Sequence, residues 1–479
     1  MFCKNLDALE QAIHQATDYA QYKSACLAYD KAAGHEQWKQ NDESDDYDYL
    51  LIRKRLEQLR QAHSEPSSLM QILHEGIHGS LGNIANPLLY QHCKFGTKVL
   101  VNDFLNQVCL SLELIFNAKP AQISFYEKLA FFESTSHAYG QSCLMLSGGA
   151  GLGFFHCGVV KALLNADLLP NVISGASAGS IITALLGTRT DEELKQQLTG
   201  ASIFSYFKGW GQWRGLTTPS LLDSTNIENA LIKLLDLTTF EEAWQKTGRQ
   251  INITVSPADL HQDSRMLNTI TSPNAIITQA VRASCAIPYL FEPVQLKAKN
   301  AQGDVIPYVP NRKFADGSIM ADLPFDRLSR LYSVNHSIVS QTNPHAVPFL
   351  SRDDRKKPGI WSTTGDYLSK LVKVNSIFAC DVIEKAIPTA RGKLGVHKFR
   401  SMLDQEYIGD INILPPRNIA NFGHLLSNPT EASIDKLIDS AERATWPKLE
   451  MINCTTKISR TFSQYLKLLR LEEKQLLAG

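Results

Sequence analysis

Two short apolar runs, each followed by glycines and then by a helical pattern, stand near the centre of the chain. The first run covers residues 143–146, and the glycine-rich segment 147–153 follows it. The second covers residues 171–174 and leads into Gly175–Gly179, after which residues 180–186 continue as a helix of small and apolar residues. A short apolar run bounded by turn residues is typical of a buried strand. The pattern predicts two successive β-turn-α units of a parallel sheet, whose loops share the rim where ligands bind.

Helical spacing dominates the two ends of the chain. Apolar residues recur at intervals of three to four through residues 9–16 and 49–56, and the segment from about residue 430 onward is helical and rich in charge. The pattern predicts a helical N-terminal domain over residues 1–140, an α/β catalytic domain over residues 141–345 and a mainly helical C-terminal region over residues 346–479. The last helical segment fits docking on the core, pairing with a second subunit or lying on a membrane, and the sequence leaves this open.

Composition narrows the class of protein. The chain has 479 residues, with 48 Lys and Arg against 48 Asp and Glu, so its charge gives no reason to expect a nucleic-acid partner. Its nine cysteines include no C-x-x-C pair, which favours buried reduced thiols in a reducing compartment. The first residues turn polar too soon for a signal peptide, and no apolar run approaches the ~18–20 residues of a membrane span. We therefore expect a cytoplasmic protein, with peripheral attachment to membranes as the alternative.

The segment Gly175–Gly179 has the pattern G-x-S-x-G with Ser177 at its centre. Between a strand and a helix, this pattern predicts a nucleophile elbow, which exposes the serine hydroxyl at the rim of the sheet. The backbone amides of Gly148, Gly149, Ala150 and Gly151 are then candidates for an oxyanion hole. A dinucleotide loop is the other interpretation of these glycines, but no acidic residue follows at the spacing that a ribose contact needs.

A serine nucleophile needs a base, and two arrangements are open. Asp316 lies in the segment Lys-Phe-Ala-Asp-Gly-Ser, where Gly317 lets another group approach closely, and it could take the serine proton directly. The alternative is a triad, in which a histidine takes the proton. His336 and His345 follow Asp316 most closely, but neither has a local setting that favours this role.

Four motifs in order resemble those of one known family. They are S-G-G-A-G-L-G-F-F-H-C-G-V-V-K-A-L-L at 147–164, I-S-G-A-S-A-G-S at 173–180, A-S-C-A-I-P at 283–288 and D-G-S at 316–318. The chain resembles the patatin-like phospholipases, in the triacylglycerol-lipase-like branch where an uncharacterised helical domain comes first. Residues 45–60, 81–87 and 127–132 are similar to typical stretches of that domain. The resemblance implies an α/β/α core with a mainly parallel sheet and a Ser–Asp dyad of Ser177 and Asp316.

Two positions depart from the pattern of that family. The glycine loop usually has a third glycine, where this chain has Ala150, and often a basic residue, where this chain has Leu152. An alanine still supplies a backbone amide, provided that the local backbone conformation tolerates a Cβ atom. The leucine removes any help from a positive charge at that point.

The sequence thus predicts a serine acyl hydrolase for carboxylic esters of phospholipids, lysophospholipids or acylglycerols. The alternatives are a CoA-independent acyltransferase with the same dyad and a non-catalytic lipid-binding scaffold. No cofactor or metal is expected, because glycines interrupt the zincin-like H-E-G-I-H segment at residues 74–78. The partners expected are the lipid substrate and a lipid surface, while the oligomeric state stays open. The aromatic and basic segment 204–214 either meets that surface or forms a buried aromatic cluster, and the sequence leaves both open.

Overall fold

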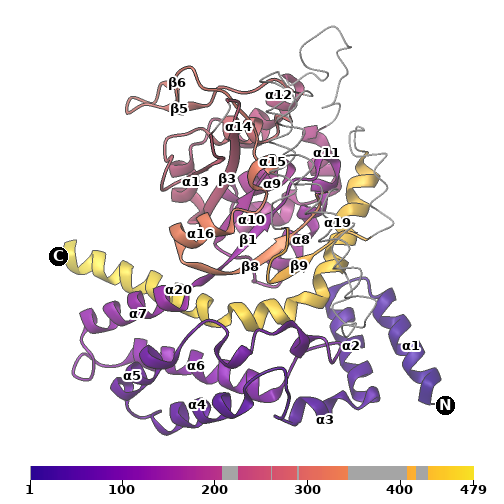
Figure 1. The fold of residues 1–479 in the computed structure, drawn as a ribbon, viewed down its shortest axis with the longest axis vertical. Helices are drawn as coiled ribbons and strands as arrows, with labels where there is room; N and C mark the ends of the chain where they lie inside the picture. The colour runs from indigo at the N-terminus through magenta and orange to yellow at the C-terminus, as the bar shows by residue number, and fades with distance from the viewer. Residues whose placement is uncertain are drawn as a thin grey trace, which may run out of the picture.

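The computed structural model describes residues 2–207, 225–259, 262–287, 291–343, 407–416 and 430–478. Two parts follow one another along the long axis of the molecule (Figure 1). The N-terminal third forms an all-helical part at one end, and the α/β part occupies the other. The predicted α/β core with helical regions on either side is therefore confirmed.

The described α/β part is built on a seven-stranded sheet with the order β4-β3-β2-β1-β8-β9, in which β7 also pairs with β3. The β1–β2, β2–β3, β1–β8 and β8–β9 pairs are parallel, whereas β4 and β7 run antiparallel to β3. The mainly parallel sheet is as predicted. The strands of this sheet are β1 (Gln141–Leu146), β2 (Val172–Gly175), β3 (Gln250–Pro257), β4 (Arg265–Asn268), β7 (Phe314–Asp316), β8 (Val334–Ser340) and β9 (Ile411–Ile413), and a separate hairpin joins β5 (Lys297–Lys299) to β6 (Val305–Pro307).

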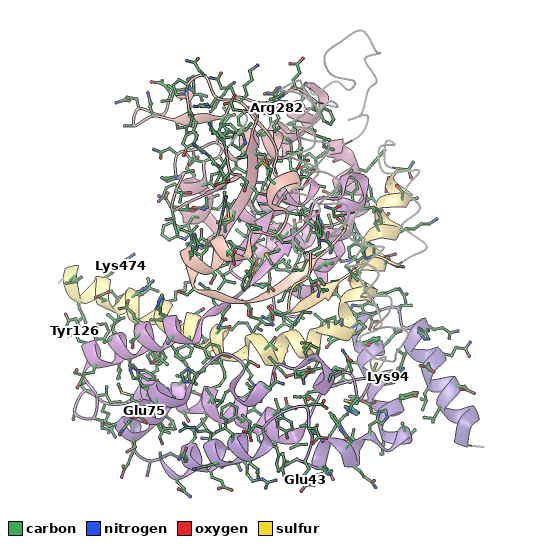
Figure 2. The ribbon with its side chains drawn as sticks, in the orientation of Figure 1. Glu43, Glu75, Lys94, Tyr126, Arg282 and Lys474 are labelled. Atoms are coloured by element: carbon green, nitrogen blue, oxygen red, sulfur yellow. The ribbon has the colours of Figure 1, made fainter. Side chains whose placement is uncertain are left out.

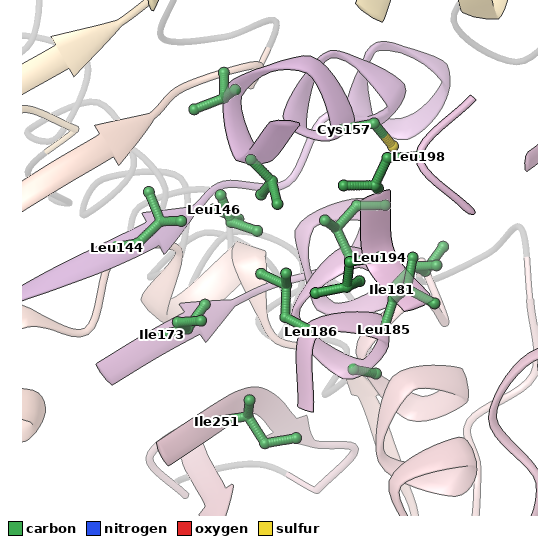
Figure 3. Close-up of a cluster of buried hydrophobic side chains, with 14 of the residues drawn as sticks. Leu144, Leu146, Cys157, Ile173, Ile181, Leu185, Leu186, Leu194, Leu198 and Ile251 are labelled. Atoms are coloured by element: carbon green, nitrogen blue, oxygen red, sulfur yellow. The ribbon is translucent and has the colours of Figure 1, made fainter. Parts of the chain in front are cut away.

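Alternate residues of β1 belong to different cores, as expected for a strand whose side chains point to opposite faces. Leu144 and Leu146 lie in the larger core, which Figure 3 shows in part, whereas Cys143 and Met145 pack in a smaller core with Leu328. Both sets are buried. The sheet is therefore covered on both faces, which is the arrangement that parallel strands require.

The helices of the α/β part pack against one or the other of these two cores. The smaller core receives α16 (Phe325–Tyr332). The larger core receives α8 (Phe155–Asn165), α9 (Ala178–Thr188), α10 (Asp191–Gln197), α11 (Gly200–Phe207), α12 (Thr225–Leu235), α13 (Phe240–Thr247), α14 (Ile277–Ser284) and α19 (Glu431–Thr445). A short helix, α15 (Ser318–Ala321), follows β7 directly.

The helical N-terminal part divides between two cores: its residues from Tyr47 onward have a core of their own, whereas Tyr22 and Cys26 lie in the larger core of the α/β part. A capping box, in which Ser124 and Glu127 bond to each other's backbone N–H, starts its last helix. Figure 2 shows Glu43 and Glu75 at the periphery of this part, where both residues are exposed. Its helices are α1 (Phe2–Gln15), α2 (Tyr19–Ala33), α3 (His35–Gln40), α4 (Tyr49–Gln61), α5 (Pro66–Gly76), α6 (Val99–Asn117) and α7 (Phe125–Tyr139).

Helix α6 differs from the sequence-based expectation that no segment could span a membrane. Among the described helices, it alone is long and apolar enough to do so by length and composition. Half of its apolar stretch is buried inside the protein, and Val101, Phe104 and Leu112 lie in the core of the helical part. We therefore interpret α6 as the central helix of that core.

The C-terminal helix α20 (Leu449–Ala478) joins the two parts of the molecule. It runs between the helical part and the sheet (Figure 1). Ile452, near its start, lies in the larger core of the α/β part, whereas Ile458 and Phe462 lie in the core of the N-terminal helices. Of the three alternatives that the sequence left open, docking on the core is the one found for this first half of the helix. The predicted C-terminal region also contributes β9 to the sheet.

Candidate active site

Ser177 lies in a sharp turn between β2 and α9. The strand ends at Gly175 and the helix begins at Ala178, so two residues make the turn. The backbone of Ser177 has a φ of 49° and a ψ of −124°, a region that L-residues seldom adopt. This strained strand–turn–helix conformation is the one that defines a nucleophile elbow.

The two glycines of the elbow permit close packing. A Cβ atom on Gly179 would collide with the carbonyl group of Leu146, at the end of β1. A Cβ atom on Gly175 would collide with Thr183 and with the backbone of Gly179. The backbone N–H of Ala176 donates to the Leu146 carbonyl oxygen at 3.2 Å. The elbow is thus packed directly against the end of the neighbouring strand.

Ser284 anchors the strained backbone of Ser177 through a hydrogen bond. The backbone N–H of Ser177 donates to Ser284 Oγ at 2.9 Å, and Ser284 Oγ donates to the carbonyl oxygen of Thr254 at 2.7 Å. The carbonyl oxygen of Ser177 accepts bonds from Ser180 Oγ at 2.6 Å and from Cys285 Sγ at 3.3 Å. Burial, and then the nearby Asp316 carboxylate, raise the pKa of the Cys285 thiol to about 12, so it stays protonated at neutral pH. Both backbone polar groups of Ser177 are therefore paired.

Asp316 is the last residue of β7 and is 2% exposed. Its backbone N–H donates to the carbonyl oxygen of Ala286 at 3.0 Å. Its Oδ1 accepts bonds from the backbone N–H of Ser318 at 2.8 Å and from Ser318 Oγ at 2.7 Å. At Gly317, a Cβ atom would collide with the carbonyl group of Thr254 in β3. The acid motif thus lies directly against β3, as the small residue after the acid indicated.

Gly148 shows how closely the three motifs meet. A Cβ atom built on Gly148 would lie 2.9 Å from the Cβ of Ser318 and 3.3 Å from the Cβ of Ser177. Ser177 itself is 5% exposed. The fold therefore brings the glycine loop, the elbow serine and the acid motif to one place at the carboxyl ends of β1 and β2.

The glycine loop corrects one sequence-based expectation. The N–H of Gly148 donates to Asp322 Oδ1 at 2.7 Å, so it is already bonded and we remove it from the candidate oxyanion donors. Within the described ranges, the N–H groups of Gly149, Ala150 and Gly151 have no acceptor. Ala150 has a φ of 46°, a conformation in which a Cβ atom costs about 1–2 kcal/mol. The alanine is thus accommodated with strain, and three amides stay candidates.

A buried polar network ties this loop to the end of β8. His156 Nε2 lies 2.9 Å from the Ser147 carbonyl oxygen, and Nδ1 lies 2.7 Å from Ser340 Oγ. Because a carbonyl oxygen only accepts, Nε2 carries the proton and Nδ1 accepts from the hydroxyl. Burial lowers the pKa of His156 to about 4, so the ring is neutral. Thr342 adds two bonds, from its N–H to Ser147 Oγ at 2.7 Å and from Oγ1 to the Gly148 carbonyl oxygen at 3.1 Å.

The histidine triad finds no support at His336, the one of its two named candidates that the structure describes. His336 pairs with Ser142 at the start of β1, whereas Ser177 follows a strand that ends opposite Leu146, at the other end of β1. At about 3.3 Å per residue, the two positions are separated by roughly 13 Å along the strands. His336 is therefore too far from the serine to be its base. His345 lies outside the described residues.

No metal site emerges in the described part of the chain, where no group of three or more His, Cys, Asp or Glu side chains could hold an ion. Helix α5 ends at Gly76, between His74 and His78. The H-E-G-I-H segment thus lacks the continuous helix that would place both histidines on one face.

Sequence reasoning missed four residues that support the site: His156, Ser284, Asp322 and Thr342. Ser284 and His156 stand inside the motifs at 283–288 and 147–164, so their position was visible but their role was not. Asp322 and Thr342 belong to none of these motifs. Their side chains matter through bonds to residues far away in the sequence, which no local pattern indicates.

Comparison with known proteins agrees with this geometry. Residues 3–137 match a family model described as a domain of unknown function, DUF3336, and residues 144–329 match the model for patatin-like phospholipase. The chain is 32% identical to triacylglycerol lipase ptl2 of Schizosaccharomyces pombe, over 94% of this chain and 74% of the relative. It is 33% identical to triacylglycerol lipase SDP1L of Arabidopsis thaliana, over 95% and 58%, and 34% identical to triacylglycerol lipase 4 of Saccharomyces cerevisiae, over 91% and 50%. The chain thus spans between half and three quarters of the length of these relatives.

A serine elbow beside a glycine-rich loop, on a mainly parallel sheet, defines the class of serine hydrolases with an α/β core. Within that class, the chain belongs to the patatin-like phospholipase family, with a DUF3336 domain in front of the patatin domain, and it is a lipid esterase. The resemblance seen in the sequence motifs is therefore confirmed.

Proposed function

We propose that this protein is a serine acyl hydrolase that works through a dyad of Ser177 and Asp316. The observation that carries the proposal is the meeting of the glycine loop with the Cβ atoms of Ser177 and Ser318, because Ser318 is bonded to the Asp316 carboxylate. Phospholipids, lysophospholipids and acylglycerols are the substrate class. The triacylglycerol lipase names of the relatives favour acylglycerols among them.

In the proposed reaction, the Asp316 carboxylate takes the hydroxyl proton of Ser177 while Oγ attacks the ester carbonyl carbon. The tetrahedral intermediate then collapses, the bond to the alcohol oxygen breaks, and Asp316 returns its proton to the leaving alkoxide. Water attacks the acyl-enzyme as Asp316 takes one of its protons. The fatty acid leaves, and Ser177 Oγ recovers that proton from Asp316.

The negative charge of each tetrahedral intermediate needs hydrogen-bond donors. In our proposal, these are the N–H groups of Gly149, Ala150 and Gly151, which precede or begin the short helix after β1. In other serine hydrolases, removal of a single oxyanion donor lowers kcat by ~10²–10³-fold. The rate of the proposed reaction therefore depends strongly on the orientation of these amides.

The direct test is labelling with an activated fluorophosphonate together with a panel of lipid esters. Wild type should be labelled and should hydrolyse at least one lipid ester, whereas the folded Ser177→Ala variant should do neither. Labelling or hydrolysis that persists in Ser177→Ala would place the nucleophile elsewhere. Product analysis with diacylglycerol as acceptor separates the hydrolase from the acyltransferase, since the latter moves the acyl group to the alcohol.

Contact with the lipid surface is the second part of this proposal. The aromatic segment 204–214 contains Trp210 and Trp213 beside two cations, a composition that favours the membrane interface. Residues 208–224 lie outside the described residues, so this part rests on the sequence. Replacing both tryptophans by alanine should weaken liposome binding and spare the hydrolysis of a short soluble ester. Equal losses on both substrates would refute it.

A further inference from the structure

Asp322 is a buried carboxyl group that the proposed reaction does not use. It follows α15, is 1% exposed and lies a short way beyond Asp316 in the chain. Its Oδ1 accepts the backbone N–H of Gly148 at 2.7 Å, and its Oδ2 accepts a bond from Asn343 Nδ2 at 3.2 Å. Asn343 itself is fixed, because its backbone N–H donates to Gln341 Oε1 at 2.9 Å. The carboxyl group thus links the glycine loop to the chain that follows β8.

The surroundings of Asp322 explain its ionisation. Burial raises its pKa to about 7, the bonds from Gly148 and Asn343 oppose that rise, and the charge of Asp316 adds to it. The titratable groups that face it are Asp316 at the end of β7 and Tyr407 ahead of β9, whose own pKa is raised by burial and by Asp322. Either form of the carboxyl group can accept a bond from Gly148, so the link does not depend on the charge.

Two successive peptide planes of the glycine loop are held at defined points. In the plane between Ser147 and Gly148, the carbonyl oxygen accepts from His156 Nε2 and the N–H donates to Asp322. In the next plane, the Gly148 carbonyl oxygen accepts from Ser147 Oγ at 2.9 Å and from Thr342 Oγ1 at 3.1 Å. Because a trans peptide points its N–H opposite to its carbonyl group, these two bonds fix the Gly149 N–H to point away from both hydroxyl groups.

We propose that Asp322 is a positioning residue that sets the direction of the oxyanion donors by holding the Gly148 N–H. This inference rests on the proposed function, in which the next amides of the loop face the reacting carbonyl oxygen. Without an acceptor, the buried Gly148 N–H would be unpaired, and turning the peptide toward another partner would rotate the neighbouring plane as well. A misplacement of about 1 Å costs on the order of 10²-fold in rate.

The test compares Asp322→Ala with Asp322→Asn, which keeps an oxygen for the Gly148 N–H. On a short soluble ester, we expect kcat of the alanine variant to fall about 10²-fold with KM changed less than about 3-fold. The asparagine variant should stay within about 10-fold of wild type, because the acceptor is retained. The inference is overturned if the folded alanine variant keeps kcat within about 3-fold, or if asparagine loses as much as alanine.

Asp410, an exposed carboxylate that accepts a different backbone N–H, offers a control next to β8. Its Oδ2 accepts the Ser337 N–H at 2.7 Å and Ser337 Oγ at 2.8 Å, but it precedes β9 and so lies at the opposite end of the sheet. Asp410→Ala should therefore lower the melting temperature without changing kcat. A fall in kcat equal to that of Asp322→Ala would show a general loss of stability and overturn the inference.

A second readout does not depend on catalysis. In the Ser177→Ala background, hydrogen exchange over residues 147–154 should accelerate 10-fold or more when Asp322 is replaced by alanine, because the Gly148 N–H loses its acceptor. Unchanged exchange overturns the inference even if Ser177 proves not to be the nucleophile. If Asp322→Ala fails to fold, the same measurement uses Asp322→Ser. The serine side chain is polar but too short to reach the Gly148 N–H.

Discussion

The hydroxyl of Ser284 bonds the elbow serine to β3, the strand next to β2 in the sheet. It accepts the backbone N–H of Ser177 at 2.9 Å and donates to the carbonyl oxygen of Thr254, in β3, at 2.7 Å. A hydroxyl group is suited to this place, because it accepts and donates at the same time. The strained turn at Ser177 is thus anchored from a helix that begins far away in the sequence.

Removal of this hydroxyl should affect both stability and rate. Ser284→Ala leaves the N–H of Ser177 and the carbonyl oxygen of Thr254 buried without this partner, which costs about 1–3 kcal/mol of the free energy of unfolding. Because the elbow relaxes, we expect kcat to fall about 10- to 100-fold. Urea unfolding and ester hydrolysis measure the two effects.

Thr188→Val is the control for Ser284→Ala. It removes a buried hydroxyl at the far end of α9, where Oγ1 donates to the carbonyl oxygen of Ala184 at 2.9 Å. We expect a change in stability and an unchanged kcat. A Ser284→Ala variant with the kcat of wild type would contradict the role of Ser284 in holding the elbow.

The second prediction separates the dyad from the triad. Asp316→Asn keeps an oxygen for the two bonds from Ser318 but removes the base, so we expect it to lose as much activity as Ser177→Ala. The double variant should lose no more than either single variant, because residues that act as one unit are not additive. Steady-state rates on a soluble ester give all three values.

His336→Gln is the matched test of the histidine alternative. His336 lies at the other end of the sheet from the elbow, beside Ser142, so most of the activity should be retained. A loss on the order of 10³ with an unchanged melting temperature would instead revive the triad.

The third prediction concerns the alanine that stands where the family usually has a glycine. Ala150 has a φ of 46°, a conformation that glycine adopts without cost. Ala150→Gly should therefore retain kcat and raise the free energy of unfolding by up to about 1 kcal/mol, after the larger entropy of the unfolded glycine is subtracted. A clear fall in the melting temperature would show that the methyl group contributes packing that outweighs the strain.

The fourth prediction concerns the loss of folding stability in acid that is due to His156. The pKa of His156 is lowered to about 4 in the folded protein, whereas the unfolded chain takes up the proton near its ordinary value of about 6.5. The unfolded state therefore binds more protons between these values, and the contribution of His156 to stability is lost as the pH falls from about 6.5 to 4. His156→Gln, which can both donate and accept but does not titrate there, should give a shallower decline. Parallel urea midpoints for the two proteins across this range would contradict it.

The elbow and the glycine loop could be predicted because each is a local pattern. A strand, a glycine turn and a helix follow one another within a few residues around Ser177, and the same order surrounds Gly148–Gly151. Alternation of side chains along β1 and the three-to-four spacing of helices likewise depend on near neighbours. These features fixed the fold class and the candidate nucleophile before any tertiary contact was known.

Other features depended on which distant segments meet. The direction of the Gly148 N–H is decided by Asp322, and the neutral state of His156 by its burial against Ser147 and Ser340. The apolar stretch of α6 is long enough for a membrane, yet it forms the centre of a core because other helices cover it. A local pattern states how apolar or polar a residue is, but only the packed chain determines which buried group it pairs with.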